Sequence, residues 1–269
     1  MQKINIKNIC IQVLKPGRLF VMLKKVFKRL MDDQGHHSKS QNLEWIEQHS
    51  SDFKELATRL DATLWGETEK VSKTLEKSIE NTFKKLEHGF GGGGVYPFLY
   101  FLTRYMKPNC IVETGVAAGC SSYAFLLAIK ANGHGRLHSS DFPYFRLPNP
   151  EQYIGVVVDN ALKDNWDLHI DGDEKNLPRI LSKIDKIGIF HYDSDKSYSG
   201  RKKVMSMIEN ALDKDGIILM DDIQDNSYFY DYIEKNNPQS WHIFEFQGKY
   251  VGMVGGATPS RSQGPTGSS

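Results

Sequence analysis

The sequence predicts an α/β protein built on a doubly wound, mostly parallel, seven-stranded sheet with a helical extension at its N-terminus. Short β-rich runs alternate with helical patterns from residue 96 onward, which is typical of βαβ units and a parallel sheet. Before residue 88 the chain is polar and helical in pattern. Four successive glycines at 91–94 separate the two textures.

These differences in sequence pattern divide the chain into four parts. We expect a helical region over residues 1–88, a joint over 89–95, the α/β domain over 96–255 and a disordered tail over 256–269. The joint is expected to be flexible because consecutive glycines stabilise neither helix nor strand. The tail is small, polar and proline-containing, so it offers little to a core.

Helical patterns in the N-terminal region fall over residues 18–31, 43–64 and 67–87. The first is amphipathic, with lysines and arginines opposite its apolar stripe. Three interpretations compete for it: a lid or dimerisation helix over the acceptor site, a peripheral membrane contact, or plain packing onto the domain. We favour the lid or homodimer because amphipathic helices usually bury their apolar stripe in protein.

Seven β-rich runs follow the joint. The last two lie close together and predict a terminal hairpin that turns at Gln247–Gly248. The runs are, in order, "CIVETG", "GRLHSSD", "WDLHIDGD", "IGIFHYDSD", "GIILMDDI", "WHIFEF" and "KYVGMVG".

Composition excludes several classes of protein. Hydrophobic residues make up 39% of the 269 and charged residues 25%, which is ordinary for a globular protein. A net charge of +1 gives no electrostatic case for a nucleic-acid partner. Three cysteines without metal-type spacing fit a reducing compartment. No apolar run reaches the roughly 20 residues of a membrane span. We therefore expect a cytoplasmic location.

The stretch "IVETGVAAGCSS" at residues 111–122 is the first candidate site. It reads as a strand, a glycine loop and the start of a helix, where Gly115 permits a tight turn and Gly119 a close backbone approach. We expect Ser121 or Ser122 to cap the helix. The acid Glu113 would repel a pyrophosphate but suits a ligand with an amino or hydroxyl group. A glycine turn without any ligand is the competing interpretation.

Acids end the next two strands as well. Asp141 ends the second strand. At this position in nucleotide-binding α/β folds, a carboxylate accepts hydrogen bonds from the ribose hydroxyls. Asp171 and Asp173 end the third. Each acid alone is compatible with a turn. Together with the glycine loop, the acids favour a nucleoside-bearing ligand.

With "VETGVAAGCSS", "SSDFP", "WDLHIDGDEKNLPRIL", "FHYDSDKSY" and "GIILMDDIQDN", the chain resembles class I S-adenosylmethionine-dependent methyltransferases, and more narrowly a bacterial subgroup of them. The resemblance covers residues 97–255. It implies S-adenosylmethionine as the cofactor. It also implies the site residues: Glu113, Gly115 and Gly119, together with Ser121, around the methionine moiety, Asp141 at the ribose and Asp173 by the adenine.

Four carboxylates end the fourth and fifth strands: Asp193, Asp195, Asp221 and Asp222. Parallel strand ends lie side by side, so these acids repel one another unless a cation intervenes. Hard oxygen ligands at this density suit Mg²⁺. A helix cap after the fifth strand is the competing interpretation of the acid pair.

The same residues resemble the site of catechol-type and caffeoyl-CoA-type O-methyltransferases. That resemblance implies Asp193, Asp221 and Asp222 as metal ligands and Lys196 as the catalytic base beside Asp193. It departs at Asp222, where those families usually carry Asn, and at Lys196, where the bacterial subgroup often carries His. A surface salt bridge between Lys196 and Asp195 is the competing interpretation. His191 and Tyr192 are interpreted as core residues.

The resulting prediction is a magnesium-assisted O-methyltransferase. Its acceptor would be the hydroxyl of a small molecule, a sugar or glycan, or a natural-product intermediate, and these classes stay open. One alternative is a hydroxylase or other oxidoreductase on the same fold, which predicts iron dependence or NAD. The other is a non-catalytic binding module, which predicts no affinity for an adenosyl ligand.

Overall fold

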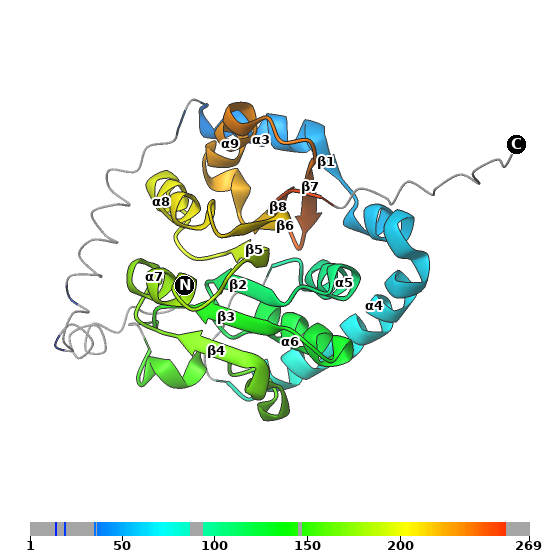
Figure 1. Cartoon of the computed structure of the whole chain (residues 1–269), viewed down its shortest axis with the longest axis vertical. Coiled ribbons are helices and arrows are strands. Elements are labelled where there is room, and N and C mark those ends of the chain that lie inside the picture. The colour runs from blue at the N-terminus through cyan, green and yellow to red at the C-terminus, as the bar shows by residue number, and fades with distance from the viewer. Residues whose placement is uncertain are drawn as a thin grey trace, which may run out of the picture.

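The computed structural model describes residues 37–86, 94–144 and 147–256, with Leu14, Leu19 and Gly35 in addition. Its elements carry the labels of Figure 1. The N-terminal part contains α3 (Lys39–His49), β1 (Ser50–Ser51), α4 (Phe53–Phe83) and α5 (Tyr96–Met106). The α/β part contains β2 (Cys110–Thr114), α6 (Cys120–Asn132), β3 (Arg136–Ser140), the 3-10 helices η1 (Pro150–Tyr153) and η2 (Asn160–Asn165), β4 (Trp166–His169), α7 (Asp173–Leu181), β5 (Ile187–Tyr192), α8 (Tyr198–Ile208), β6 (Leu212–Met220), η3 (Ile223–Asp225), α9 (Tyr228–Asn236), β7 (Trp241–Phe246) and β8 (Lys249–Val254).

The described strands form one sheet in the order β1-β7-β8-β6-β5-β2-β3-β4. All neighbouring pairs are parallel except β6–β8 and β7–β8, so the predicted doubly wound and mostly parallel sheet is confirmed. The strand order reverses between β2 and β5, which is where ligands bind in sheets of this kind. The glycine loop and Asp193 lie at this reversal.

The strand number was predicted wrongly, because the described residues form eight strands rather than seven. The addition is β1, whose two residues pair in parallel with Ile243 and Phe244 of β7. A two-residue strand has no periodicity that a sequence pattern can reveal. Through β1 the N-terminal region becomes part of the same sheet as the α/β part.

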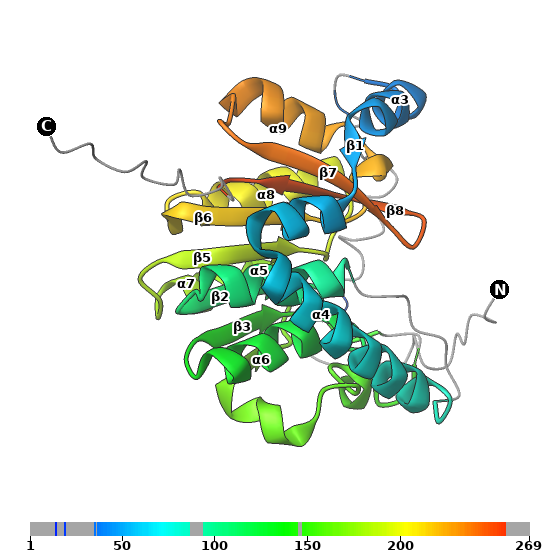
Figure 2. The same ribbon diagram turned by 90° about the vertical axis from the view of Figure 1, so that its right-hand side faces the viewer.

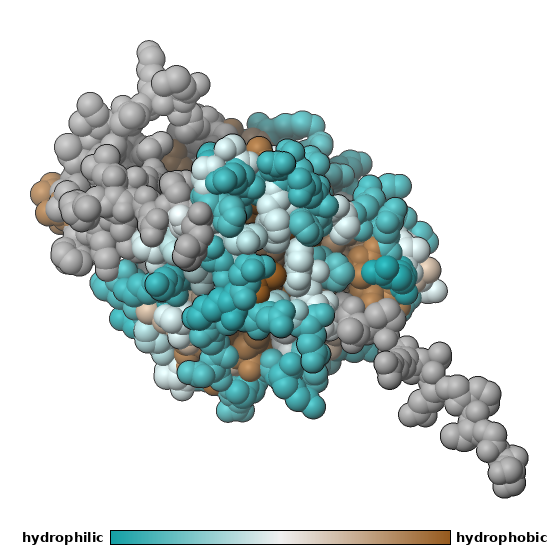
Figure 3. Space-filling model, turned by 90° about the horizontal axis from the view of Figure 1, so that it is seen from above, coloured by the Kyte–Doolittle hydropathy of each residue, from teal (hydrophilic) through white to brown (hydrophobic). Residues whose placement is uncertain are grey.

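Helices cover both faces of the sheet (Figures 1 and 2). Ile111, Ile189 and Leu219 pack under α4, α5 and α6. Val112 and Phe190, one residue along their strands, pack under α7 and α8 on the other face, which α3 and α9 also cover. This alternation explains why both faces of the central strands are apolar. The surface visible in Figure 3 is mostly hydrophilic, with hydrophobic residues in small separate patches.

The predicted helix boundaries at 43–64 and 67–87 are wrong. The helical stretch is interrupted at residues 50–52. The Asp52 side chain accepts the Lys54 N–H there and caps the start of α4. Gly66 lies inside α4, because the neighbouring Trp65 is buried there. Asp61 is the non-helical residue within α4, and its carboxylate accepts the N–H of Leu64.

The predicted hairpin is confirmed. Gln247 and Gly248 join β7 to β8 with φ angles of 52° and 75°. The predicted helix over 18–31 lies outside the described residues, apart from Leu19, and so do most of the glycine joint and the tail beyond Gly256.

Candidate active site

The carboxyl ends of β3, β2, β5 and β6 meet at one edge of the sheet. Backbone hydrogen bonds join each end to the next: Gly115 N–H donates to the Ser140 carbonyl, Asp193 N–H to the Thr114 carbonyl and Asp221 N–H to the Tyr192 carbonyl, each at 2.8–2.9 Å. The predicted site residues therefore share one continuous edge. The sheet geometry brings them together across more than 100 residues of sequence.

The glycine loop is packed against protein rather than open on all sides. Gly115 has φ 83°, and a Cβ atom there would lie 2.3 Å from the carbonyl oxygen of Asp193. Gly119 has φ 96°, and its Cβ would lie 2.8 Å from Cα of Gly155. Both positions therefore require glycine. The predicted serine cap is wrong: Gly119 is the N-cap of α6, and it supplies no side-chain hydrogen bond.

Glu113 lies beneath this loop and is fully buried. Its carboxylate accepts the hydroxyls of Ser121 and Ser122, both at 2.5 Å, and of Ser139 at 2.9 Å. These bonds replace the water that a buried carboxylate loses. They tie β2 to the first turn of α6. The cofactor roles of Glu113 and Ser121 stay predictions.

Asp141 holds the other side of the loop. One carboxylate oxygen accepts the N–H groups of Val116 at 3.2 Å and Ala117 at 2.8 Å. Asp173, in the first turn of α7, accepts the Ser140 hydroxyl at 2.6 Å. The two predicted nucleoside contacts thus lie at adjoining strand ends.

The loop side of the site fits a nucleoside with hydroxyl and amino groups. Asp141 and Asp173 are partly exposed hydrogen-bond acceptors, which suit ribose hydroxyls and amino groups but would repel a phosphate. Glu113 is buried, and its oxygens already accept three serine hydroxyls. The first turn of α6 adds backbone N–H groups without a side-chain cap. This chemistry matches the adenosyl and methionine parts of S-adenosylmethionine.

The downstream acids are paired with cations of the chain itself. The Lys196 ammonium contacts Asp193 and lies 3.1 Å from Oδ2 of Asp222. Lys249 lies 3.1 Å from the other oxygen of Asp222. The Asp221 carboxylate faces the ring of His191. Each predicted metal ligand therefore already has a cationic partner.

As they lie, these three acids do not fit a metal centre. Across the described ranges, no group of three or more His, Cys, Asp or Glu side chains is placed to hold a metal ion. Lys196 lies between Asp193 and Asp222, and Asp222 has a left-handed backbone, φ 54°. Arg201 fixes that turn by donating to the carbonyls of Asp221 and Asp222.

Charges around Lys196 favour its protonated form. Burial acts to lower the pKa of Lys196, but the charges of Asp193, Asp221 and Asp222 outweigh it and leave the pKa raised. A base requires the opposite shift, because only the neutral amine can accept a proton. Burial raises the pKa of Asp193 to about 6, against the opposing charge of Lys196.

His191 is the residue that sequence reasoning missed. It is fully buried on β5, with Nδ1 3.5 Å from Oε1 of Glu113 and Nε2 3.2 Å from Oδ1 of Asp221. Burial acts to lower its pKa, but Asp221 and Glu113 raise it to about 10. Strand alternation predicted a core position, which is correct for its burial. The register of three strands places a carboxylate beside each ring nitrogen, and the sequence pattern does not predict that register.

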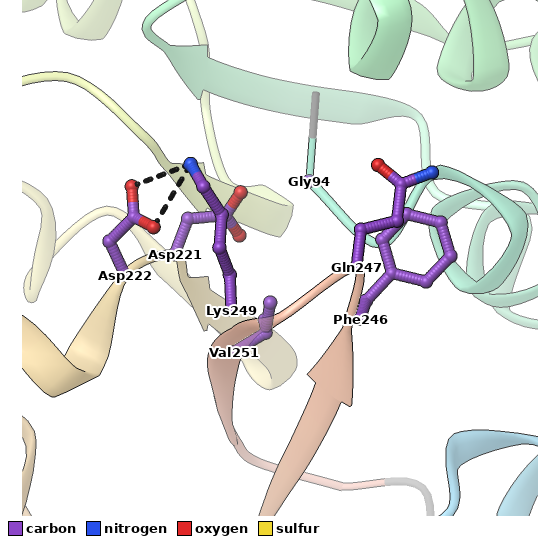
Figure 4. Close-up of a pocket in the computed structure, with 7 residues that line it drawn as sticks. All are labelled: Gly94, Asp221, Asp222, Phe246, Gln247, Lys249 and Val251. Carbon is purple, nitrogen blue, oxygen red and sulfur yellow. Dashed lines mark hydrogen bonds and ion pairs between the residues drawn. The ribbon is translucent and has the colours of Figure 1, made fainter. Parts of the chain in front are cut away.

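A cavity of about 90 Å³ opens beside the acids (Figure 4). Gly94 lies across it from Asp221 and Lys249, and Phe246 and Gln247 of the hairpin border it (Figure 4). Ligand sites commonly measure about 300–1,000 Å³. The cavity has room for a few non-hydrogen atoms rather than for a whole large molecule.

Comparison with known proteins agrees with this geometry. Residues 112–223 match a family model described as a methyltransferase domain. The fold resembles an O-methyltransferase from Bacillus cereus in complex with SAH (S-adenosylhomocysteine), with a TM-score of 0.53, 15% identity and coverage of 68% of this chain and 91% of that one. It resembles a Streptomyces achromogenes O-methyltransferase involved in tomaymycin synthesis, in complex with SAM (S-adenosylmethionine), with a TM-score of 0.53, 12% identity and coverage of 67% and 88%. It also resembles a putative caffeoyl-CoA O-methyltransferase from Staphylococcus aureus, with a TM-score of 0.52, 14% identity and coverage of 68% of this chain and 92% of that one.

A curated relative matches part of the chain. It is the ribosomal RNA large subunit methyltransferase E of Methanosphaera stadtmanae, 28% identical over 126 residues, which are 46% of this chain. The chain spans 61% of the length of that relative. Residues 112–223 thus match a methyltransferase domain, and the fold is that of the solved methyltransferases named above.

Within the described part of the chain, no helix is long and apolar enough to cross a membrane. The cytoplasmic location, the homodimer, the membrane contact and the lack of a nucleic-acid partner stay predictions.

Proposed function

We propose that the chain transfers the methyl group of S-adenosylmethionine to a hydroxyl of a small-molecule acceptor, such as a sugar, a glycan end or a natural-product intermediate. The observation that carries the proposal is the contact between the two half-sites. The backbone of Asp193 packs on Gly115 of the cofactor loop, and the Asp193 side chain belongs to the charged cluster beside the cavity. A hydroxyl held by this cluster lies next to the cofactor loop.

When bound, the cofactor supplies a methyl group activated by a positively charged sulfur. Asp193 accepts the hydroxyl proton, and its raised pKa makes it a stronger base than an ordinary aspartate. Lys196 keeps its proton and stabilises the negative charge that develops on the acceptor oxygen. This division of roles replaces the predicted base Lys196. Gly94 and Phe246 limit the space around the acceptor.

The sequence also predicts magnesium assistance. Lys196, Lys249 and His191 already pair with Asp193, Asp221 and Asp222, so the proposed transfer uses no metal ion. Chelator dependence decides this point. Activity that survives EDTA supports the lysine-based site, and activity that requires added Mg²⁺ supports the predicted ligands.

The experiment is methyl transfer from radiolabelled S-adenosylmethionine to a panel of hydroxyl-bearing acceptors, with ribosomal RNA as a separate arm because the curated relative is named for that substrate. We expect label on a small hydroxyl acceptor, lost in Asp193→Asn. Label on RNA alone would overturn the acceptor class. If no acceptor is labelled and the chain has no affinity for S-adenosylhomocysteine, the methyltransferase proposal is overturned and a binding module remains.

A further inference from the structure

A buried histidine joins the two halves of the site. Glu113 and His191 are direct partners in the parallel pairing of β2 and β5, so their side chains lie on the same face of the sheet. The ring of His191 packs edge-on against Phe125 of α6. Its Nδ1 is 3.5 Å from Glu113 and its Nε2 is 3.2 Å from Asp221.

The Glu113 side of this contact belongs to the cofactor half. The same carboxylate receives the hydroxyls of Ser121 and Ser122, which form the first turn of α6 directly after the glycine loop. Any ligand that shifts this turn therefore shifts the carboxylate that faces His191 Nδ1.

The Asp221 side belongs to the acceptor half. Asp221 lines the cavity, and its Oδ2 lies toward Gly94, where a Cβ atom would be 2.6 Å away. Its Oδ1 faces His191 Nε2. The histidine thus determines which oxygen of Asp221 is presented to the cavity.

We propose that His191 is a positioning residue that couples the cofactor site to the acceptor site, by holding Asp221 in register with Glu113. This rests on the proposed function. A histidine that only filled the core would face apolar neighbours, whereas this one is fully buried with a carboxylate at each ring nitrogen. Replacing Asp221 leaves Nε2 of His191 without its partner in a buried site, so the effect reaches Glu113 through the shared ring.

The test is calorimetric titration of the full chain with S-adenosylhomocysteine. We expect Asp221→Asn, at the acceptor cavity, to weaken binding at least about fivefold through His191. In a His191→Gln background the same substitution should change affinity less than about twofold. The matched control is Asp225→Asn, which removes the same charge four residues along and should leave affinity within about twofold of wild type.

A second measurement uses the wild-type chain and so does not depend on whether a variant folds. In wild-type chain labelled with ¹⁵N-histidine, the two ring N–H signals of His191 should both shift when S-adenosylhomocysteine is added. The ring signals of His138, buried in the middle of β3 and paired with Asp167, should not. A shift at neither ring nitrogen of His191, or an Asp221→Asn affinity equal to that of Asp225→Asn, would overturn the coupling. Failure of the proposed function appears differently, as absence of S-adenosylhomocysteine binding to the wild type.

Discussion

The ammonium of Lys196 lies 3.1 Å from Oδ2 of Asp222 while it also contacts Asp193, so one lysine bridges the ends of β5 and β6. This bridge holds a positive charge beside Asp222, which lines the cavity. It also occupies the space between two acids that would otherwise repel.

Replacing Lys196 should therefore impair turnover much more than cofactor binding. We expect Lys196→Ala to lower kcat about 10²–10³-fold, the usual loss on removing one preorganised group that stabilises developing charge. Calorimetry should show S-adenosylhomocysteine affinity within about twofold of wild type. Lys202→Ala, on the exposed side of α8, is the matched control and should retain full turnover. Equal losses in both variants would contradict the assigned role.

Stability should fall as pH rises, because of His191. Its folded-state pKa of about 10 exceeds the ordinary 6.5, so its contribution is complete below pH 6.5 and is lost as pH rises through 10. Across pH 7–9.5, urea unfolding of wild type should lose up to about 1.4 kcal/mol per pH unit from this group. His191→Gln should flatten the profile. His138→Gln should not, since burial lowers the pKa of His138 and places its titration below this range.

Gly94→Ala should block the acceptor cavity. An added Cβ would lie 2.6 Å from Oδ2 of Asp221 and 3.0 Å from Nε2 of His191, which forces the loop or Asp221 to move. A displacement of about 1 Å can cost on the order of 10²-fold in rate. We expect kcat/KM for the acceptor to fall by that order.

The matched control for this variant is Gly66→Ala. Gly66 lies inside α4 with no atom within 4 Å of an added Cβ. The control should keep activity and raise the free energy of unfolding by about 0.5–1 kcal/mol. Unchanged acceptor kinetics in Gly94→Ala would show that the cavity is not the acceptor site.

The N-terminal helices should contribute to the stability of the whole domain. Asn42 of α3 is buried, and its amide donates to the carbonyls of Ile223 at 3.0 Å and Asn226 at 3.1 Å. Asn42→Ala leaves both carbonyls unpaired, so the free energy of unfolding should fall by about 1–3 kcal/mol. Gln48→Ala, exposed on the same helix, should change it by less than about 0.5 kcal/mol. A single unfolding transition in both variants is also expected.

The sequence patterns predicted the strands and the shared edge of the site because these follow from local periodicity and from acids placed after apolar runs. Asp141, Asp193 and Asp221 all lie at strand ends, as predicted. The partners of His191 could not be predicted, because they depend on the register of β2, β5 and β6, which one residue of slip would change. The pairing of Lys196 with Asp222 has the same origin.

The break at residues 50–52 was missed for a different reason. Ser50 and Ser51 follow a helical pattern, and only their pairing with β7 makes them a strand. The expectation at Trp65–Gly66 failed because burial of Trp65 against Phe53 and Phe101 keeps the helix continuous across the glycine. Both errors show tertiary contacts overriding local propensity.

Calorimetric titration of wild type, Asp141→Ala and Asp171→Ala with S-adenosylhomocysteine is the decisive test of a cofactor site at the end of β3. Asp171 is an exposed acid after the neighbouring strand β4, paired with Arg179, and serves as the control. We expect wild-type binding that is retained in Asp171→Ala and weakened at least about tenfold in Asp141→Ala, with both variants folded by thermal melting. No binding by folded wild-type chain, or equal binding by all three, would contradict it.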